Sequence, residues 1–268
     1  MITVLKEDGT EEEFSEEKLL TGIRRAGIPK NLQEELVSHV KQRLYDRIPT
    51  HEIYRHVGEY LGKSEPIFQA KYSLKRAIME IGPTGFPFEI YISEVLKALG
   101  YETEVGVILR GKCVNHEVDV IAKKPDKKVF VECKYHNKPG IRSDVHVALY
   151  TKARFDDLKA KHNFSEALLV TNTKITTDAL DYANCENINV IGWNYPESEG
   201  LRDLVEKYKL FPITQFPIIS FSEKTKLLEK NIVLAKQICQ NPSILNDVEI
   251  DPNKKEKIIK EAELICSL

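Results

Sequence analysis

Two apolar segments in the middle of the chain are joined by a short polar link. The segments at residues 117–122 and 129–134 are rich in valine and isoleucine, and the link between them reads Lys-Lys-Pro-Asp-Lys-Lys. This pattern predicts two antiparallel β-strands joined by a turn. If Ala122 pairs with Val129, the same register places Asp119 directly opposite Glu132.

Helix and strand patterns alternate on both sides of this hairpin. The predicted order is a helix at 89–99, strands at 101–109, 117–122 and 129–134, a helix at 143–161, a strand at 167–171, a helix at 176–184 and a strand at 189–191. Alternation of this kind predicts a mixed α/β sheet flanked by helices. We expect the sheet to form a central domain at residues 84–205.

The flanking regions read differently. Residues 1–83 begin with a small hairpin that turns at Asp8-Gly9 and ends at Phe14. A helix starts at Ser15, and further helices are predicted at 31–45, 50–61 and 67–81. Residues 206–268 are helical again, after a first helix at 201–208, with helices at 222–230, 233–240 and 254–266. The chain is therefore predicted to be a multidomain α+β protein with domains at 1–83, 84–205 and 206–268.

Charge and cysteine content exclude several classes of protein. Lys and Arg number 39 against 41 Asp and Glu, a net charge of −2, so any nucleic-acid site must be a local basic patch. No apolar run approaches the roughly 20 residues of a membrane helix. Five dispersed cysteines without a CxxC pair suggest neither a disulfide framework nor a zinc site. A protein of the reducing cytoplasm, without a membrane partner, is expected.

Opposed carboxylates on a hairpin are unfavourable without a cation. Asp119 and Glu132 would have Cβ atoms about 5 Å apart, where two ionised carboxylates repel. Lys134 shares the face of Glu132 by the two-residue period of a strand, while Val131 and Cys133 point to the other face. Such a set can hold a divalent ion and a water for phosphodiester cleavage. Equally, it can be a solvated strand face with Lys134 between the two acids.

The motif also resembles a known family. Pro-Phe-Glu at Glu89, His-Glu-Val-Asp-Val-Ile around Asp119 and Val-Glu-Cys-Lys from Glu132 to Lys134 resemble the D…ExK signature of restriction-endonuclease-like nucleases, in their Mrr-like branch, over about residues 84–205. The resemblance implies that Asp119 and Glu132 bind Mg²⁺ or Mn²⁺, that Lys134 positions or activates the attacking water, and that Glu89 is an accessory acid. The implied substrate is DNA.

Further polar residues near this motif are candidates for contact with phosphate. They are His116, Tyr135 and His136 beside the strands, and Arg142, Lys152 and Arg154 around the next helix. The alternative is that they are polar neighbours of the site, and for Lys152 that it lies on a solvated helix face.

Residues 106–113 resemble a P-loop but do not match it. Cys113 replaces the magnesium-binding Ser or Thr, and the run between the glycines reads as a strand, so no P-loop ATPase is predicted.

The N-terminal segment resembles the ATP-cone, the regulatory nucleotide-binding domain of ribonucleotide reductases and their repressor. The similarity lies in residues 4–19, in Ile-Pro-Thr at 48–50 and in residues 70–76. It implies that ATP or dATP binds with Val4 at the base, with Lys6, Lys18 and Arg76 at the phosphates, and with Thr50 in a neighbouring part of the pocket. No P-loop accompanies this segment, so binding without hydrolysis is expected.

The C-terminal segment resembles degenerate helix-hairpin-helix modules that lack the usual glycines, and we leave open whether it contacts DNA or another protein.

Together, the nuclease-like motif and the ATP-cone-like segment predict a nucleotide-regulated, divalent-metal-dependent endonuclease that acts on DNA. The alternative is a non-catalytic regulator that binds DNA in response to ATP or dATP and retains the nuclease fold. A duplex cut requires two catalytic centres, and ATP-cones act through association of chains, so at least a homodimer is expected.

Overall fold

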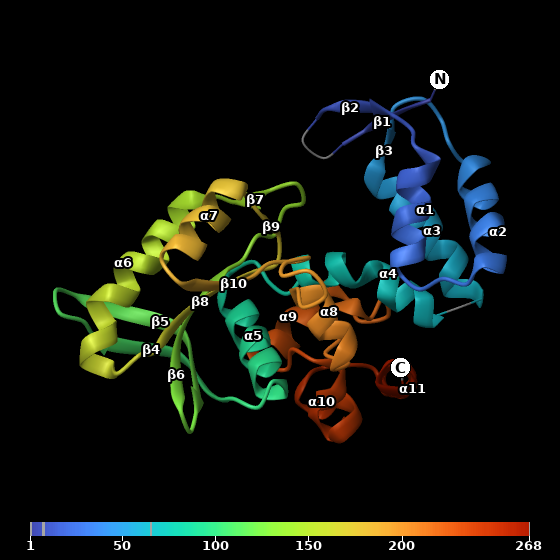
Figure 1. Cartoon of the computed structure of the whole chain (residues 1–268). Helices are drawn as coiled ribbons and strands as arrows, with labels where there is room; N and C mark the ends of the chain where they lie inside the picture. Colours follow the sequence, from blue (N-terminus) through green and yellow to red (C-terminus); the bar gives the residue numbers. More distant parts are fainter. Residues whose placement is uncertain (1, 7–8, 65, 268) are drawn as a thin grey trace. The chain divides into compact units, whose positions relative to one another are not determined.

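A computed structural model describes residues 2–6, 9–64 and 66–267 (Figure 1). The chain forms two compact units that divide between Lys75 and Arg76, within helix α4 (Pro66–Met79). Each unit is described by itself.

The described part of the first unit contains a small sheet, three whole helices and the first part of α4. Its strands β1 (Thr3–Leu5), β2 (Glu11–Glu13) and β3 (Ile48–Pro49) lie in the order β2-β1-β3. The predicted hairpin is confirmed as the antiparallel pair β1 and β2, although Asp8 of its predicted turn lies outside the described residues. The parallel strand β3 was not predicted, because two residues are too few to show a strand period.

The helices of this unit are α1 (Glu16–Arg25), α2 (Lys30–Lys41) and α3 (Thr50–Ser64). The Ser15 hydroxyl accepts a hydrogen bond from the N–H of Lys18 and so caps α1, as the sequence predicted. Helix α2 ends earlier than expected, at Lys41, since the chain turns back toward β3 through Arg47, whose φ is +62°. Val4 and Ile23 are buried in the shared core.

The second unit is built on a five-stranded mixed sheet, as predicted. The order is β10-β8-β6-β5-β4, with bounds β4 (Glu102–Arg110), β5 (Asn115–Lys124), β6 (Lys127–Lys134), β8 (Glu166–Thr171) and β10 (Ile188–Ile191). Strands β4, β5 and β6 are antiparallel neighbours, whereas β6, β8 and β10 are parallel. A two-stranded pair of β7 (Arg142–Ser143) and β9 (Lys174–Ile175) was not predicted.

Helices cover both faces of this sheet. They are α5 (Phe86–Ala98), α6 (Val145–His162) and α7 (Thr177–Cys185), and α6 and α7 lie side by side (Figure 1). Phe130 of β6 packs against Phe155 of α6, while Tyr135, directly after β6, packs against Phe88 of α5. Most residues of β5 and β6 from Val118 to Glu132 are buried or half-buried, so the strand face that carries Asp119 and Glu132 is not freely solvated, as one alternative had it.

The register of the central hairpin is the predicted one. Ala122 pairs with Val129, and the ladder continues to Lys124 and Lys127, so the turn is only Pro125 and Asp126 rather than residues 123–128. In the other direction the β5–β6 ladder stops at the pair Val120–Val131. Beyond that point β5 pairs only with β4, and β6 only with β8.

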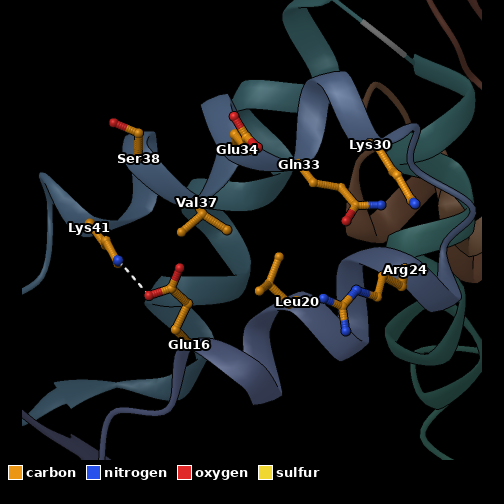
Figure 2. Close-up of a pocket in the computed structure, with 9 residues that line it drawn as sticks. All are labelled: Glu16, Leu20, Arg24, Lys30, Gln33, Glu34, Val37, Ser38 and Lys41. Atoms are coloured by element: carbon orange, nitrogen blue, oxygen red, sulfur yellow. Dashed lines mark ion pairs between the residues drawn. The ribbon is translucent and has the colours of Figure 1, made fainter.

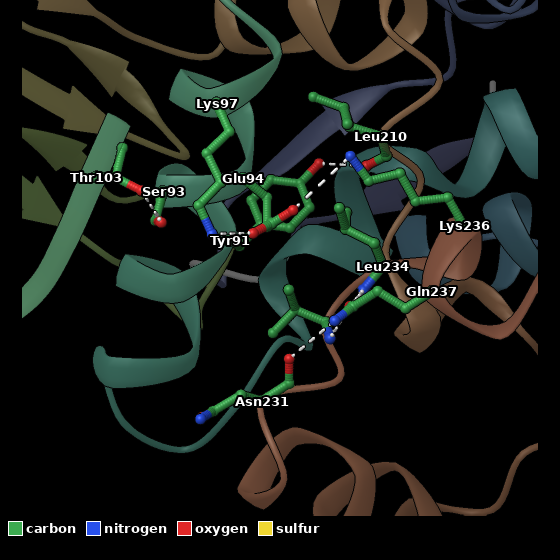
Figure 3. Close-up of polar contacts among 11 residues, drawn as sticks. Tyr91, Ser93, Glu94, Lys97, Thr103, Leu210, Asn231, Leu234, Lys236 and Gln237 are labelled. Atoms are coloured by element: carbon green, nitrogen blue, oxygen red, sulfur yellow. Dashed lines mark hydrogen bonds and ion pairs between the residues drawn. The ribbon is translucent and has the colours of Figure 1, made fainter. Parts of the chain in front are cut away.

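The C-terminal helices belong to the same compact unit as the sheet. They are α8 (Leu201–Lys207), α9 (Phe221–Glu229), α10 (Ala235–Gln240) and α11 (Pro252–Ser267), with short 3-10 turns at Ile213–Gln215 and Pro242–Asp247. Figure 3 shows two contacts of this region with α5: the Tyr91 hydroxyl donates to the carbonyl of Leu210, after α8, at 2.8 Å, and Lys236 of α10 lies 3.7 Å from Glu94.

A disulfide joins Cys239 of α10 to Cys266 of α11, which corrects the expectation of none. The two cysteines are 27 residues apart and show no local motif, so only the packing of α10 against α11 brings them together. Cys113, Cys133 and Cys185 remain free thiols. None of the helices in the described ranges is long and apolar enough to cross a membrane.

Candidate active site

Asp119 lies where the central hairpin separates. Its Oδ2 accepts a hydrogen bond from the backbone N–H of Cys133 at 2.7 Å, so the side chain takes the place of the next ladder bond. The prediction that Asp119 and Glu132 form a directly opposed ladder pair was wrong, because the ladder ends one pair earlier. The two acids nevertheless approach the same cation.

That cation is Arg154 of α6. One guanidinium nitrogen, Nη1, is ion-paired with Glu132 Oε2 and lies 3.9 Å from Asp119 Oδ1. The other, Nη2, donates to the backbone carbonyl of Glu117. Arg154 is only 7% exposed, so it is not the solvent-facing phosphate contact that the sequence suggested.

Lys134 does not bridge the two acids. It pairs with Thr171 in the β6–β8 ladder and is exposed, and it forms no ion pair with either acid in the described part of the chain. The alternative of a solvated face neutralised by Lys134 is therefore wrong. An exposed lysine two residues beyond Glu132 on the same strand face remains available to a phosphate.

Burial makes ionisation of the acids costly. It raises the pKa of Glu132, with Asp119 as the second cause, while Arg154 opposes the rise. Burial also raises the pKa of Asp119, against the N–H of Cys133 and the charge of Arg154. Burial first, then Asp119 and Glu117, raise the pKa of Glu89 to about 7. The site thus gathers more carboxyl groups than one guanidinium can neutralise if all of them ionise, and the raised pKa values reflect this.

The donor set fits a hard divalent cation. Asp119 and Glu132 supply carboxylate oxygens, and their shared contact with Arg154 Nη1 marks a position that accepts positive charge. Among the described residues there is no group of three or more His, Cys, Asp or Glu side chains arranged around one point. Mg²⁺ is ordinarily held by one or two carboxylates, completed by waters and substrate phosphates, so two acids suffice.

A polar network fixes the segment that follows Lys134. The backbone N–H of His136 donates to Asn172 Oδ1 at 2.9 Å, and Asn172 Nδ2 donates to the His136 carbonyl at 2.7 Å. The His136 ring lies 3.1 Å from the Ser143 hydroxyl, which donates to Thr171. Asn172 is fully buried, and this positioning role was missed because an Asn after a strand is common in turns.

Three of the predicted phosphate contacts have other partners. The Tyr135 hydroxyl donates to the Met79 carbonyl, and its ring packs on Phe88. His116 Nε2 lies 2.8 Å from Asp157, which also accepts the N–H of Cys113 and so holds the β4–β5 loop. The third is Lys152, which is neutralised by Asp156 and Glu186. The run between the two glycines of the near P-loop, residues 107–110, belongs to β4, as expected, and Cys113 lies in the loop after it.

In the first unit, Lys6 and Lys18 share one acid. Each ammonium lies 2.7 Å from Glu12 Oε2. Hydrogen bonds from Lys18 and then Lys6 lower the pKa of Glu12. Val4 is buried at the centre of β1, and Thr50 begins α3. The structure thus gathers the two predicted phosphate lysines, with a carboxylate already between them.

Arg76, the third predicted phosphate contact, belongs to the second unit. Its Nε lies 2.7 Å from Glu80, and its side chain is 72% exposed. Its predicted contact with a phosphate stays a prediction.

A groove of about 600 Å³ runs between α1 and α2 (Figure 2). Leu20 and Val37 lie in it, with an ion pair between Glu16 and Lys41 at one side. The remaining lining residues are Arg24, Lys30, Gln33, Glu34 and Ser38. None of the predicted nucleotide residues Val4, Lys6, Lys18 and Thr50 lines this groove, so it is separate from the predicted nucleotide site.

Comparison with known proteins confirms both resemblances. Residues 2–80 match the ATP cone domain, residues 83–196 match a restriction endonuclease domain of the Mrr type, and residues 211–266 match the AF1548-like C-terminal domain. An uncharacterized protein of Archaeoglobus fulgidus is 33% identical over 177 residues, which are 65% of this chain and 99% of that protein. The crystal structure of AF1548, a protein of unknown function, superposes with a TM-score of 0.62 at 32% identity, covering 69% of this chain and all of that one.

Proposed function

The chain belongs to the AF1548-like family, and from this membership and its site we propose that it is a nucleotide-regulated endonuclease that requires Mg²⁺ or Mn²⁺ and cleaves DNA. The observation that carries the proposal is the approach of Asp119 and Glu132 to one cation position. A role in binding alone would not require two buried acids that repel each other.

Each motif residue has a part in this reaction. Asp119 and Glu132 hold the metal, which when bound supplies a water of lowered pKa and offsets charge on the phosphate. Lys134 is exposed beside them and positions the water or the scissile phosphate. Glu89, whose pKa near 7 allows it to carry a proton at neutral pH, is the accessory acid.

The substrate reaches the site by local charge alone. With a net charge of −2, the chain has no general attraction for DNA, so the phosphate backbone must follow exposed cations such as Lys134 and Arg142. We assign catalysis to residues 84–205 and nucleotide binding to residues 1–83. The C-terminal domain at 206–268 packs on α5, and its contact with DNA is a further part of the proposal.

ATP or dATP would regulate cleavage through the first unit. Lys6 and Lys18 are assigned to the phosphates, Val4 to the base and Thr50 to the adjoining pocket. The two lysines are already 2.7 Å from one carboxylate oxygen, a spacing that also suits a phosphate oxygen. In this proposal, nucleotide binding changes the association of chains. Association then controls cutting, because each chain has one catalytic centre and a duplex cut needs two.

Crystals soaked in Mn²⁺ test the metal site. We expect an anomalous peak between the carboxylates of Asp119 and Glu132, and no peak in crystals of the Glu132→Gln variant. The same soak of Asp126→Asn, on the turn at the far end of the hairpin, should keep the peak. Absence of manganese from the wild-type site at millimolar concentration would contradict the proposal.

A further inference from the structure

We propose that Arg154 is a built-in counterion that occupies the metal position of the free protein and must leave it when a divalent ion binds. This inference rests on the proposed metal-dependent nuclease function. Arg154 Nη1 contacts Glu132 and lies 3.9 Å from Asp119, the same two acids that are assigned to the metal. One nitrogen between two carboxylates stands where a bridging cation would stand.

The surrounding charge explains why a cation is needed there at all. Asp119 and Glu132 are nearly buried, with side chains 15% and 12% exposed, and Glu117 and Glu89 add negative charge nearby. Within the described residues, Arg154 is the one basic side chain that forms an ion pair with either acid. Without it, two repelling carboxylates would remain in a site of low polarity, which is strongly destabilising.

The fit of Arg154 is incomplete, and this makes it displaceable. Its Nε is buried and has no hydrogen-bond partner among the described residues. A buried donor left unpaired costs about 1–3 kcal/mol. A group built only to hold the fold would ordinarily have all its donors satisfied.

Two aromatic rings beside Arg154 give its guanidinium a path toward solvent. Its Cζ lies 5.5 Å from the centre of the Phe130 ring and 5.2 Å from that of Tyr150. Tyr150 stands one helical turn earlier on α6 and is 59% exposed. The guanidinium can therefore move outward along the Tyr150 ring and keep its favourable contact with an aromatic face.

Competition for one position has a measurable consequence. A metal ion that binds the wild-type site must first displace a positive charge, so the measured affinity is lower than that of the bare carboxylates. Removal of the charge should strengthen metal binding by about tenfold or more, because a unit charge about 4 Å away interacts strongly even at an effective protein dielectric. A purely positioning arginine would give the opposite result, since its loss would loosen Glu132 and weaken binding.

Calorimetric titration of the full chain with Mn²⁺ distinguishes a displaceable counterion from a purely positioning arginine. We expect Arg154→Met, which keeps much of the side-chain volume, to bind Mn²⁺ at least about tenfold more tightly than wild type, and Arg154→Lys to stay near wild type. In EDTA, Arg154→Met should melt at a lower temperature than wild type and gain more from added Mn²⁺. Lys152 lies on the same helix but pairs with Glu186, not with the motif acids. The control variant Lys152→Met should therefore change neither the Mn²⁺ affinity nor the gain in melting temperature from Mn²⁺.

Equal or weaker Mn²⁺ binding by Arg154→Met would overturn the inference while leaving the metal site intact. If neither the wild type nor any variant binds Mn²⁺, the proposed function fails as well. A second measurement covers the case in which Arg154→Met does not fold. In Mn²⁺-soaked wild-type crystals, the contact between Arg154 and Glu132 should be broken, and its persistence beside a bound ion would refute displacement.

Discussion

The carboxylate of Asp119 accepts a hydrogen bond from the backbone N–H of Cys133, with 2.7 Å between Oδ2 and the nitrogen. This bond ties the first acid of the motif to the strand that carries Glu132 and Lys134, at the level where β5 and β6 cease to pair. The two strands cease to pair at this level, and the bond keeps Asp119 attached to β6.

If the nucleotide binds at Lys6 and Lys18 as proposed, Glu12 should compete with it for these two lysines. Because Glu12 holds both Lys6 and Lys18, Glu12→Gln should free them and tighten ATP binding by about threefold to tenfold, the range expected from two surface ion pairs. Titration calorimetry measures the change. Glu13→Gln makes the same charge change on the same strand and should have a much smaller effect. Equal effects of the two variants would show that only the overall charge matters.

Glu89 gives the metal-free protein a pH dependence. Its pKa is about 7 in the folded chain and 4.5 in an exposed one, so the stability linked to its neutral form is fully present below pH 4.5 and is lost as pH rises through 7. Glu89→Gln avoids this loss and should exceed wild type by about 2 kcal/mol at pH 8 in EDTA.

Urea unfolding at pH 4.5 and pH 8 checks the prediction for Glu89. The two proteins should converge at the lower pH. Glu94→Gln, on the same helix but paired with Lys97, should show no gain at pH 8. A Glu89→Gln protein no more stable than wild type at pH 8 would mean that Glu89 is ionised without penalty.

The parts of the fold predicted from sequence are those set by local patterns. The order of helices and strands in the sheet followed from the apolar patterns. The Ala122–Val129 pairing, which the sequence interpretation assumed, is the observed one, and burial of a strand face is what fixes such a register. Asp119, Glu132 and Lys134 were singled out from the same strand pattern, and their roles in metal binding and cleavage stay predictions.

The parts that sequence analysis missed depend on long-range packing. Arg154 reaches Glu132 only because α6 covers that face of β6, and nothing in residues 143–161 distinguishes this arginine from its solvent-facing neighbours. The end of the ladder at Val120 was also not predictable, because a side-chain bond from Asp119 replaces a backbone bond. Pairing of Cys239 with Cys266 likewise depends on the packing of α10 on α11.

The Cys239–Cys266 disulfide should stabilise the second unit. Closing a loop of 27 residues restricts the unfolded chain, and in the chain-entropy model this contributes roughly 3 kcal/mol. Cys239→Ser or a reducing agent should therefore lower the melting temperature by several degrees. Cys185→Ser, at an exposed free thiol, is the control and should leave it unchanged. If reductant has no effect on the oxidised wild type, the bond does not constrain the fold.

Nucleotide should alter the assembly of chains. We expect at least a dimer, and a different oligomer size with ATP or dATP than without, since linkage requires the nucleotide to bind one assembly more tightly than the other. Light scattering at concentrations where DNA is cut measures this. A monomer of unchanged mass under every condition would remove the proposed route of regulation.

Cleavage of plasmid DNA by the purified chain tests the central claim most directly. Nicked and linear products should appear with Mg²⁺ or Mn²⁺ and be absent in EDTA, and Asp119→Asn should lower the rate at least about 100-fold, because the metal and its water act as one unit. Asp126→Asn, which removes a carboxylate from the same hairpin, should cut like wild type. Metal-independent cutting, full activity of Asp119→Asn, or binding of DNA without any cutting would contradict the account, and the last result would favour a non-catalytic DNA-binding regulator.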